Sequence, residues 1–589
     1  MPQIVKTKLI KRGFRKRRRQ VEGMTVEANR QLDKHVFRRL NNLQYSWRFI
    51  SSWVLMAVLL LSGLAYQTKY LDRYYLFDKP VAGGEFVEGI QGAFSNANPI
   101  YAVSAVDTSV SKLIFSGLLK YDNKGNLTGD LAEKWSIDDN RTTYTFNIRK
   151  NAFWHDGKEV TADDVAFTIH AIQNPDTLSP YNLSWQDVAV RVVDKKTVQL
   201  ILPGPLTSFA YSLTQGIVPK HILENTPYAQ LRSSEFNNRK PIGSGPFMWN
   251  NFVTLSNSDD ALRQRITMNN HTSYHLGTPK LDRYTVEIFG QESEAVKALT
   301  ARHINGVTMT SSPKNLDSNT IKHSIPTLNG VYIFFNTQRA PFTDKGVRNA
   351  AAQIIDVKNV LAQLDYVPIG VNGPLLRNSS AYDASRVQKS TDIAKAIELL
   401  DKAGWVKPPS SFVRQKGGKP LEFTLLTENQ PEYTKIVDIL QRQFADVGVK
   451  MNVTIKDGKD FQRSLLSHDY DALLYSISIG NDPDVYVYWH SSQATPDRFN
   501  FSEYKSGIAD SALESGRSRP DGDLRKIKYR TFLDAWREDS PAVGLYQPRV
   551  LFALNDVLYN FKEFQLSQTS DRYSSVHEWM INTKKSPID

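Results

Sequence analysis

Alternating apolar and polar residues mark several strands in the chain after about residue 80. Tyr144, Phe146 and Ile148 are separated by polar residues, which predicts a strand with one buried face. Two further β-rich runs, 190–193 and 197–202, flank a short polar turn and predict a hairpin. These patterns indicate sheets that bury one face and leave the other polar.

Helical patterns follow the strands. Residues 161–164, Thr-Ala-Asp-Asp, resemble a capping box, and the apolar residues after them recur at helical spacing, so a helix should begin there. In the second half, a buried strand at 332–335 precedes a helix at 347–355, and a helix at 431–448 leads into a strand at 449–455. The repeated succession of helix and strand predicts α/β organisation.

One segment near the N-terminus is apolar and uninterrupted by charge. Phe49 to Thr68 comprises 20 residues without a formal charge. At about 1.5 Å per helical residue, this segment spans roughly 30 Å, the thickness of a bilayer core. Aromatic residues lie near its two ends, as they often do at membrane interfaces: Trp47, Trp53, Tyr66 and Tyr70. We therefore predict one transmembrane helix over 49–68.

Almost all of the net charge of +12 lies in a basic arm before this segment. Residues 1–48 hold 14 of the 73 Lys and Arg but 3 of the 61 Asp and Glu, a balance of +11. The positive-inside rule then places the arm in the cytoplasm and the large remainder outside. The run 15–19, Arg-Lys-Arg-Arg-Arg, fits a solvated tail near anionic lipid, with a nucleic-acid-binding arm as the alternative. The near-neutral remainder does not support a nucleic-acid surface.

A cleaved signal peptide is the alternative to an uncleaved anchor. Its basic region would be 48 residues long, well beyond the usual pattern, and no convincing small-x-small cleavage site follows. Leu61-Ser62-Gly63 resembles the start of a bacterial lipoprotein signal, but the next residue is Leu64 rather than Cys. We expect a single-pass protein of the cell membrane with an extracytoplasmic domain.

The sequence offers no motif of catalysis or metal binding. It has no cysteine, which excludes disulfides and thiolate sites. Residues 154–157, Trp-His-Asp-Gly, contain one His without a partner at metal-ligand spacing, and Asp-Gly is a turn dipeptide. Residues 243–245, Gly-Ser-Gly, lack the spacing of a serine-hydrolase elbow. We predict no enzyme activity, no metal and no cofactor.

Several short motifs occur in a characteristic order. They are Gly-Leu-Leu at 117–119, Leu-Ala-Glu-Lys-Trp at 131–135, Trp-His-Asp-Gly at 154–157, Thr-Ala-Asp-Asp-Val at 161–165, Pro-Ile-Gly-Ser-Gly-Pro-Phe at 241–247, Phe-Asn-Thr at 335–337, Leu-Asp-Lys-Ala-Gly-Trp at 400–405, Asp-Pro-Asp at 482–484 and Pro-Ala-Val-Gly-Leu-Tyr at 541–546. Through this ordered set, roughly residues 82–570 resemble bacterial extracellular solute-binding proteins of the oligopeptide, dipeptide and nickel-binding type, family 5, which serve ABC importers.

The resemblance implies a two-lobed α/β fold of the periplasmic-binding-protein type, class II, with an extra subdomain on the first lobe. Lobe I would comprise 82–330, lobe II would comprise 331–539, and 540–589 would return to lobe I. The hinge would lie near Asn336 and again near 539–541. The lobes would close on a ligand held between them.

The segment 471–490 carries the most information about the ligand. Its strand places Ile477 and Ile479 on one face with other apolar residues, and serines on the opposite face. In peptide-binding relatives, an acidic residue four positions before the proline pairs with the ligand's α-ammonium, and here that position is Ile479. Asp482 could supply the carboxylate instead or cap the turn before Pro483, or the ligand could lack a free amine.

The resemblance and this segment together suggest eight ligand-binding residues. They are Asn96, Asn98, Tyr475, Ser476, Ser478, Ile479, Asp482 and Trp489. The two asparagines precede the first signature helix, and the aromatic residues could equally pack in the core.

The sequence thus predicts a monomeric, membrane-anchored extracytoplasmic protein that captures oligopeptides or similar extended solutes. By resemblance, it would deliver them to the permease subunits of an ABC transporter. The alternative is a transmembrane ligand-sensing receptor that uses the same binding module, although an arm of 48 residues is short for a signalling domain.

Overall fold

The computed structural model describes most of the chain and divides it into two compact units. The described residues are 23–27, 29–31, 34, 46–122, 124–206, 209–256, 262–309, 316–364, 366, 368–456, 458–480, 482–519, 522–563 and 565–587. The first unit comprises residues 1–79 and 583–589, and the second comprises 80–582. The basic run at 15–19 lies outside the described residues.

The first unit contains a long apolar helix and a two-stranded ribbon. Helix α3 spans Trp47–Tyr75, and its segment Trp47–Gln67 is long and apolar enough to cross a membrane. The side chains along this segment are exposed, for example Leu59 at 63%. Strand β1 (Leu76–Val81) pairs with β23 (Asn582–Pro587). The predicted apolar span therefore forms one continuous helix.

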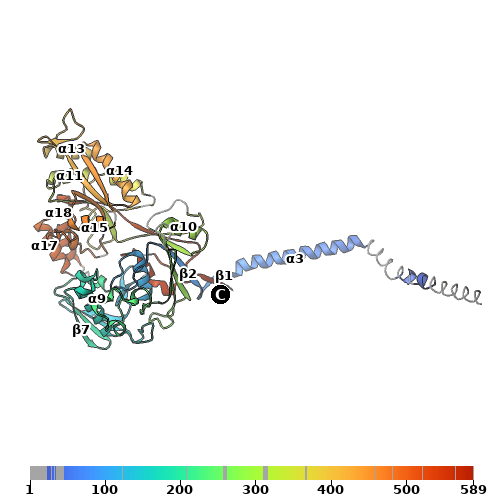
Figure 1. Ribbon diagram of the computed structural model, residues 1–589. Helices are drawn as coiled ribbons and strands as arrows, with labels where there is room; N and C mark the ends of the chain where they lie inside the picture. The colour runs from blue at the N-terminus through green and yellow to red at the C-terminus, as the bar shows by residue number, and fades with distance from the viewer. Residues whose placement is uncertain are drawn as a thin grey trace, which may run out of the picture. The chain divides into compact units, whose positions relative to one another are not determined.

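A seven-stranded mixed sheet forms the centre of the first lobe (Figure 1). Strand β2 runs parallel to its neighbours β11 and β12, whereas β22 is antiparallel to β12 and β13. In sheet order the strands are β13 (Ile321–Pro326), β22 (Arg549–Leu554), β12 (Gly306–Met309), β2 (Glu85–Gln91), β11 (Arg283–Phe289), β10 (Arg263–Asn270) and β9 (Phe247–Ser256). Helix α4 (Ala105–Ile114) packs against this sheet with Val110 and Leu113 fully buried.

A four-stranded antiparallel sheet is inserted into the first lobe. Its order is β5 (Ala132–Ile137), β6 (Thr143–Ile148), β8 (Thr197–Ile201) and β7 (Ala189–Asp194). Strand β6 buries Tyr144, Phe146 and Ile148, and β7 and β8 form a hairpin, so both predictions are confirmed. Helix α5 (Ala162–Gln173) begins with the predicted capping box. The Thr161 side chain accepts the backbone N–H of Asp164, and the Asp164 side chain accepts the backbone N–H of Thr161.

A six-stranded sheet forms the centre of the second lobe. Its order is β15 (Ile369–Gly370), β21 (Ala542–Gln547), β14 (Asn329–Phe335), β20 (Ala472–Ser478), β18 (Glu422–Glu428) and β19 (Lys450–Lys456). The covering helices include α11 (Lys345–Ile354), α13 (Ile393–Lys402), α14 (Pro431–Asp446), α17 (Gly507–Arg517) and α18 (Asp523–Asp539). Strand β14 is buried almost throughout, as its apolar run predicted.

Helix α14 is followed by strand β19, as predicted, but one apolar residue of β19 that was expected to be buried is exposed. The helix is followed by Gly448 at φ +82, a conformation that glycine adopts without a Cβ penalty. In β19, Met451 is buried, but Ile455 is 43% exposed. The reason is that β19 is the edge strand of the sheet. One of its sides has no neighbouring strand whose side chains would cover Ile455.

The chain passes between the two sheets twice. The first crossing is Thr327–Leu328, between β13 and β14, and the second is Pro548, between β21 and β22. Because β21 pairs with β14, residues 542–547 belong to the second sheet rather than to a return segment that begins at 540. The crossings thus differ from the expected hinge near Asn336 and 539–541.

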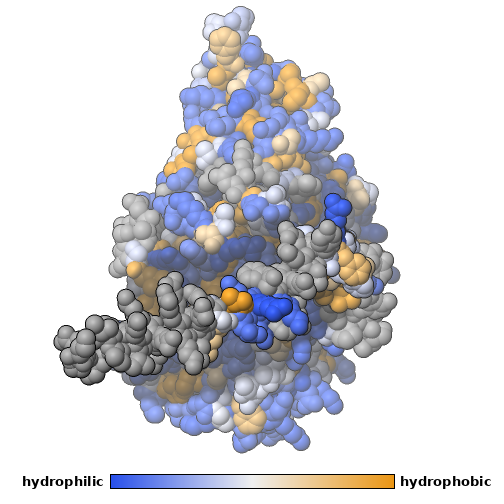
Figure 2. Space-filling model, turned by 90° about the vertical axis from the view of Figure 1, so that its right-hand side faces the viewer, coloured by the Kyte–Doolittle hydropathy of each residue, from blue (hydrophilic) through white to orange (hydrophobic). Residues whose placement is uncertain are grey.

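The surface of the second unit is typical of a water-exposed protein. On the face in Figure 2, hydrophilic side chains surround scattered apolar ones. Isolated apolar side chains are ordinary on such surfaces.

Candidate functional site

A cavity of about 660 Å³ lies between the two lobes, within the second unit. The first lobe contributes residues from α4 and from the start of η5 (Thr569–Glu578). The second lobe contributes the facing ends of β14 and β20 and the loop after β20. The lining residues are Val103, Ala105, Thr108, Tyr121, Ser212, Thr214, Thr327, Asn329, Ser478, Ile479, Gly480, Asp482, Asp484, Ser567, Gln568, Thr569 and Asp571. Its size suits a solute bound between walls from both lobes.

The second-lobe wall begins where β14 and β20 pair. Asn329 and Ser478 are opposite each other in this antiparallel pair, and both border the cavity. The side-chain oxygen Oδ1 of Asn329 is buried and has no hydrogen-bond partner among the described residues. A buried acceptor of this kind lacks the partner that folded proteins normally provide. Oδ1 of Asn329 is therefore an unused hydrogen-bond acceptor in a residue that borders the cavity.

Ile479 lies at the boundary between this wall and the core of the second lobe. Its side chain is 6% exposed and packs in a cluster with Leu473 and Ile477. Its backbone N–H donates to the carbonyl of Leu328 at 2.9 Å, which ties the end of β20 to the first crossing. The apolar side chain supplies no counter-charge for a ligand ammonium at this position.

Asp482 borders the cavity, but its carboxylate is bound within the protein. Arg525 of α18 donates from Nη2 to Oδ1 at 2.6 Å and from Nη1 to Oδ2 at 2.9 Å. The Asp482 carboxylate also accepts the backbone N–H of Asp484 at 2.9 Å, the turn-capping contact considered from the sequence. Burial raises the pKa of the Asp482 carboxyl, and the bonds from Arg525 oppose that shift. Its negative charge is thus largely compensated by Arg525.

The two predicted asparagines stabilise the turn before α4. Asn98 is fully buried, donates from Nδ2 to Oδ1 of Asn237 at 3.0 Å, and accepts the N–H of Ile100. Asn96 accepts the N–H of Asn98 at 2.8 Å. Neither asparagine is among the residues that line the cavity.

The predicted aromatic residues pack behind the cavity. Tyr475 lies between the rings of Phe461 and Phe501, each with a centroid distance of 5.6 Å. Trp489 is fully buried against Phe334 and Trp536.

Ser476 has a buried hydroxyl, whereas Ser478 is exposed at the end of β20. Of the eight predicted residues, the structure brings Ser478, Ile479 and Asp482 to the cavity.

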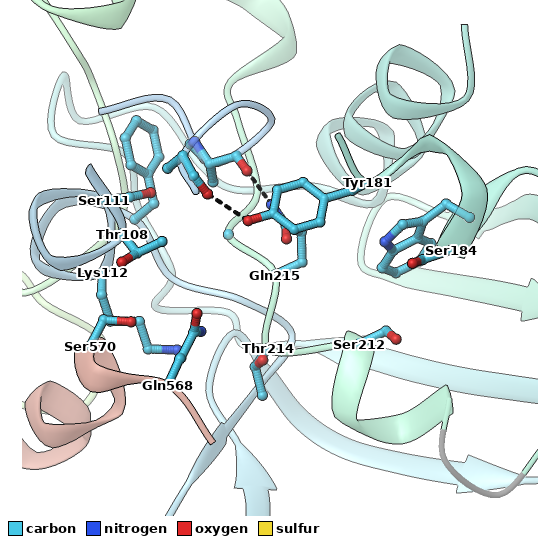
Figure 3. A pocket seen from close by; sticks show the side chains of 15 residues that line it. Thr108, Ser111, Lys112, Tyr181, Ser184, Ser212, Thr214, Gln215, Gln568 and Ser570 are labelled. Atoms are coloured by element: carbon cyan, nitrogen blue, oxygen red, sulfur yellow. Dashed lines mark hydrogen bonds between the residues drawn. The ribbon is translucent and has the colours of Figure 1, made fainter. Parts of the chain in front are cut away.

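A smaller recess of about 230 Å³ adjoins the cavity inside the first lobe (Figure 3). The two spaces share Thr108, Ser212, Thr214 and Gln568. Sequence reasoning missed this recess. Thr108 and Lys112 of α4 both line it and are four residues apart. In a helix this spacing places both side chains on one face, so it could have indicated a polar wall in the sequence.

Two α/β lobes, two chain crossings and a cavity between the lobes define the class of solute-binding proteins. The family model for bacterial extracellular solute-binding proteins, family 5 (middle), matches residues 126–499. The chain belongs to this family.

Relatives and solved structures agree with this assignment. The oligopeptide-binding protein AppA of Bacillus subtilis is 29% identical over 503 residues, which cover 82% of this chain and 90% of AppA. The structure of that protein with a nonapeptide is similar with a TM-score of 0.71 at 27% identity, covering 85% of this chain and 100% of that one.

NikZ of Campylobacter jejuni in complex with Ni(L-His) is similar with a TM-score of 0.71 at 27% identity, covering 84% and 99% of the two chains. The two-lobed fold is therefore shared by relatives whose bound ligands differ.

Proposed function

We propose that this protein captures oligopeptides in the cavity between its lobes and delivers them to the permease of an ABC importer. The cavity bordered by both lobes is the observation that carries this proposal. AppA, which binds oligopeptides, is similar over most of both chains and supports a peptide as the solute. The matched relatives are binding proteins, which supports a role other than catalysis.

Closure of the lobes would occur about the two crossings. The N–H of Thr327 donates to the carbonyl of Pro548 at 3.0 Å, and Nε2 of Gln547 donates to the carbonyl of Thr327 at 3.0 Å. These bonds join the crossings side by side, so they can act as one hinge. In this scheme, residues 328–547 move as the second lobe.

The charge distribution of the second-lobe wall favours solutes without a free α-amine at this position. Ile479 offers no carboxylate, and the Asp482 carboxylate is occupied by Arg525. An ammonium buried there would lack a partner, which costs several kcal/mol. Longer peptides, whose amine extends into water, or N-blocked peptides meet this condition.

The protein would act at the membrane surface, held by α3 with its N-terminus in the cytoplasm. The apolar segment of α3 and the basic residues before it support this orientation. Protease treatment of spheroplasts should remove the large domain and leave a small protected membrane fragment. A freely soluble product that begins near residue 65–70 would contradict the anchor.

Native mass spectrometry of the full-length protein in detergent tests the proposed ligand. The protein is incubated with a library of nonapeptides and with Ni(L-His), and retained molecules are identified by mass. Retention of peptides at one per chain is the expected result. Retention of the nickel complex without any peptide would contradict the peptide proposal, but it would leave the assignment to the solute-binding family intact.

A further inference from the structure

The recess inside the first lobe contains one cationic group and no carboxylate. Among its described lining residues, Lys112 is the single charged side chain. No ion pair involving Lys112 occurs in the part of the chain that the structure describes, and α4 places this residue in its last turn. An ammonium in a partly enclosed site is stabilised when an anion accompanies it.

A second unpartnered group borders the same recess. The hydroxyl of Ser570 is buried, with the residue 1% exposed, and has no hydrogen-bond partner among the described residues. In Figure 3, Lys112, Gln568 and Ser570 are drawn on one side of the recess and Ser184 on the other. An ammonium and a free hydroxyl on one wall provide the donors that a carboxylate accepts.

Three other polar groups around the recess are already engaged. The hydroxyl of Tyr181 donates to the carbonyl of Ala102, and the amide of Gln215 donates to the carbonyl of Pro99. Thr108 donates its hydroxyl to the carbonyl of Ser104 at 2.8 Å. Lys112 is therefore the single charged side chain among the described lining residues, and the buried Ser570 hydroxyl is an unpartnered donor on the same side of the recess.

One competing anion is Asp571, which follows Ser570 in η5 and whose carboxyl feels the charge of Lys112. It is fully buried, and its Oδ2 accepts the N–H of Gln568 at 2.9 Å in a capping box. Burial raises the pKa of its carboxyl, and the charge of Lys112 opposes this shift. Oδ1 of Asp571 is buried without a hydrogen-bond partner, and among the described residues no ion pair joins this carboxylate to Lys112, so the ammonium can bind another anion.

The size of the recess limits what enters it. Its volume of about 230 Å³ is below the range of roughly 300–1,000 Å³ typical of a site for a whole small molecule. It opens onto the interlobe cavity through shared wall residues, so one group of a larger solute can extend into it. The rings of Phe115 and Trp185 line the remainder and reduce access to water.

We propose that this recess is a carboxylate subsite for the bound peptide, with Lys112 as its cation and the Ser570 hydroxyl as a second donor. The subsite rests on the proposed peptide function and specifies which peptides are preferred. The carboxylate is either the peptide's C-terminus or an acidic side chain, because both present the same two oxygens.

Competition between matched peptide libraries tests the subsite on the full-length protein in detergent. One pair of nonapeptide libraries differs in a C-terminal carboxylate or amide, and a second pair, amidated throughout, differs in Glu or Gln at one randomised position. Retained peptides are quantified by mass spectrometry. The wild type should prefer the carboxylate member of one pair by about tenfold, the effect of one charge-assisted contact. The pair that shows the preference identifies the source of the carboxylate.

Two variants and one control assign the preference to Lys112. Lys112→Met should abolish it while peptides are still retained, and Lys112→Arg should restore it in part. Lys124→Met, at an exposed lysine outside the recess, should leave it unchanged. Peptide retention without a carboxylate preference, or a preference that survives in Lys112→Met, would overturn the subsite and leave the peptide function intact. Failure to retain any peptide would overturn both.

Discussion

The buried pair of Asp482 and Arg525 leads to the most detailed prediction. Arg525 is 1% exposed and Asp482 is 7% exposed, and two hydrogen bonds join them. Arg525→Met removes both bonds and leaves an uncompensated carboxylate next to the cavity. Breaking a buried pair from one side costs about 3–5 kcal/mol, so we expect a loss of this size in the free energy of unfolding.

The complementary variants separate a structural role from ligand binding. Asp482→Asn retains one acceptor and removes the charge, and it leaves Arg525 with a weaker partner. The double variant Asp482→Asn, Arg525→Met removes both charges and should be less destabilised than the sum of the single variants by about 1–3 kcal/mol. Lys526→Met is the matched control, because this neighbouring residue on α18 is 47% exposed and pairs with Asp523 only at 3.9 Å.

Thermal unfolding of the full-length variants, followed by near-ultraviolet circular dichroism, measures these differences. The ratio of affinities for free and N-acetylated peptides is measured in parallel by calorimetry. Asp482→Asn should lower stability and leave this ratio unchanged within about twofold, less than 0.5 kcal/mol. Additive effects in the double variant would refute the pairing argument. A free-amine preference above tenfold that Asp482→Asn removes would show that Asp482 binds the ligand amine.

Three further predictions follow from single positions. Ile479→Asp places a carboxylate at the cavity edge and should raise the affinity of free-amine peptides at least tenfold over N-acetylated ones by calorimetry; equal affinities would show that the amine lies elsewhere. Gly448→Ala should lower the unfolding free energy by about 1 kcal/mol or more, because its φ is +82; an unchanged unfolding midpoint would contradict this. Burial lowers the pKa of His155 to about 3, so the unfolded chain binds the extra proton first as the pH falls below about 6.5. Stability should therefore decrease from pH 7 to pH 5, less steeply in His155→Gln, and identical slopes in the two proteins would contradict this assignment.

Local elements were predictable because neighbouring residues determine them. The alternation at Tyr144, Phe146 and Ile148 and the capping box at Thr161 specify β6 and α5 without reference to the rest of the chain. The membership of β21 was not predictable in this way. Its residues are all buried, and only the distant pairing with β14 places them in the second sheet.

The candidate site shows the same division between local and distant information. Ser478, Ile479 and Asp482 were found because they surround one recognisable Asp-Pro-Asp motif. Arg525 was not found, because it lies 43 residues from Asp482 on a helix rich in charged residues. Nothing in the sequence distinguishes its buried guanidinium from the exposed charges beside it.

Movement of the lobes on peptide binding tests the central claim most directly. The chain has no cysteine, so two introduced cysteines can carry a donor and an acceptor dye specifically. Lys124→Cys in the first lobe and Phe412→Cys in the second, where Phe412 is 88% exposed, provide surface positions. We predict that a retained nonapeptide changes the transfer efficiency between the dyes to a single new value at saturation. An unchanged efficiency with bound peptide would contradict closure about Thr327–Leu328 and Pro548.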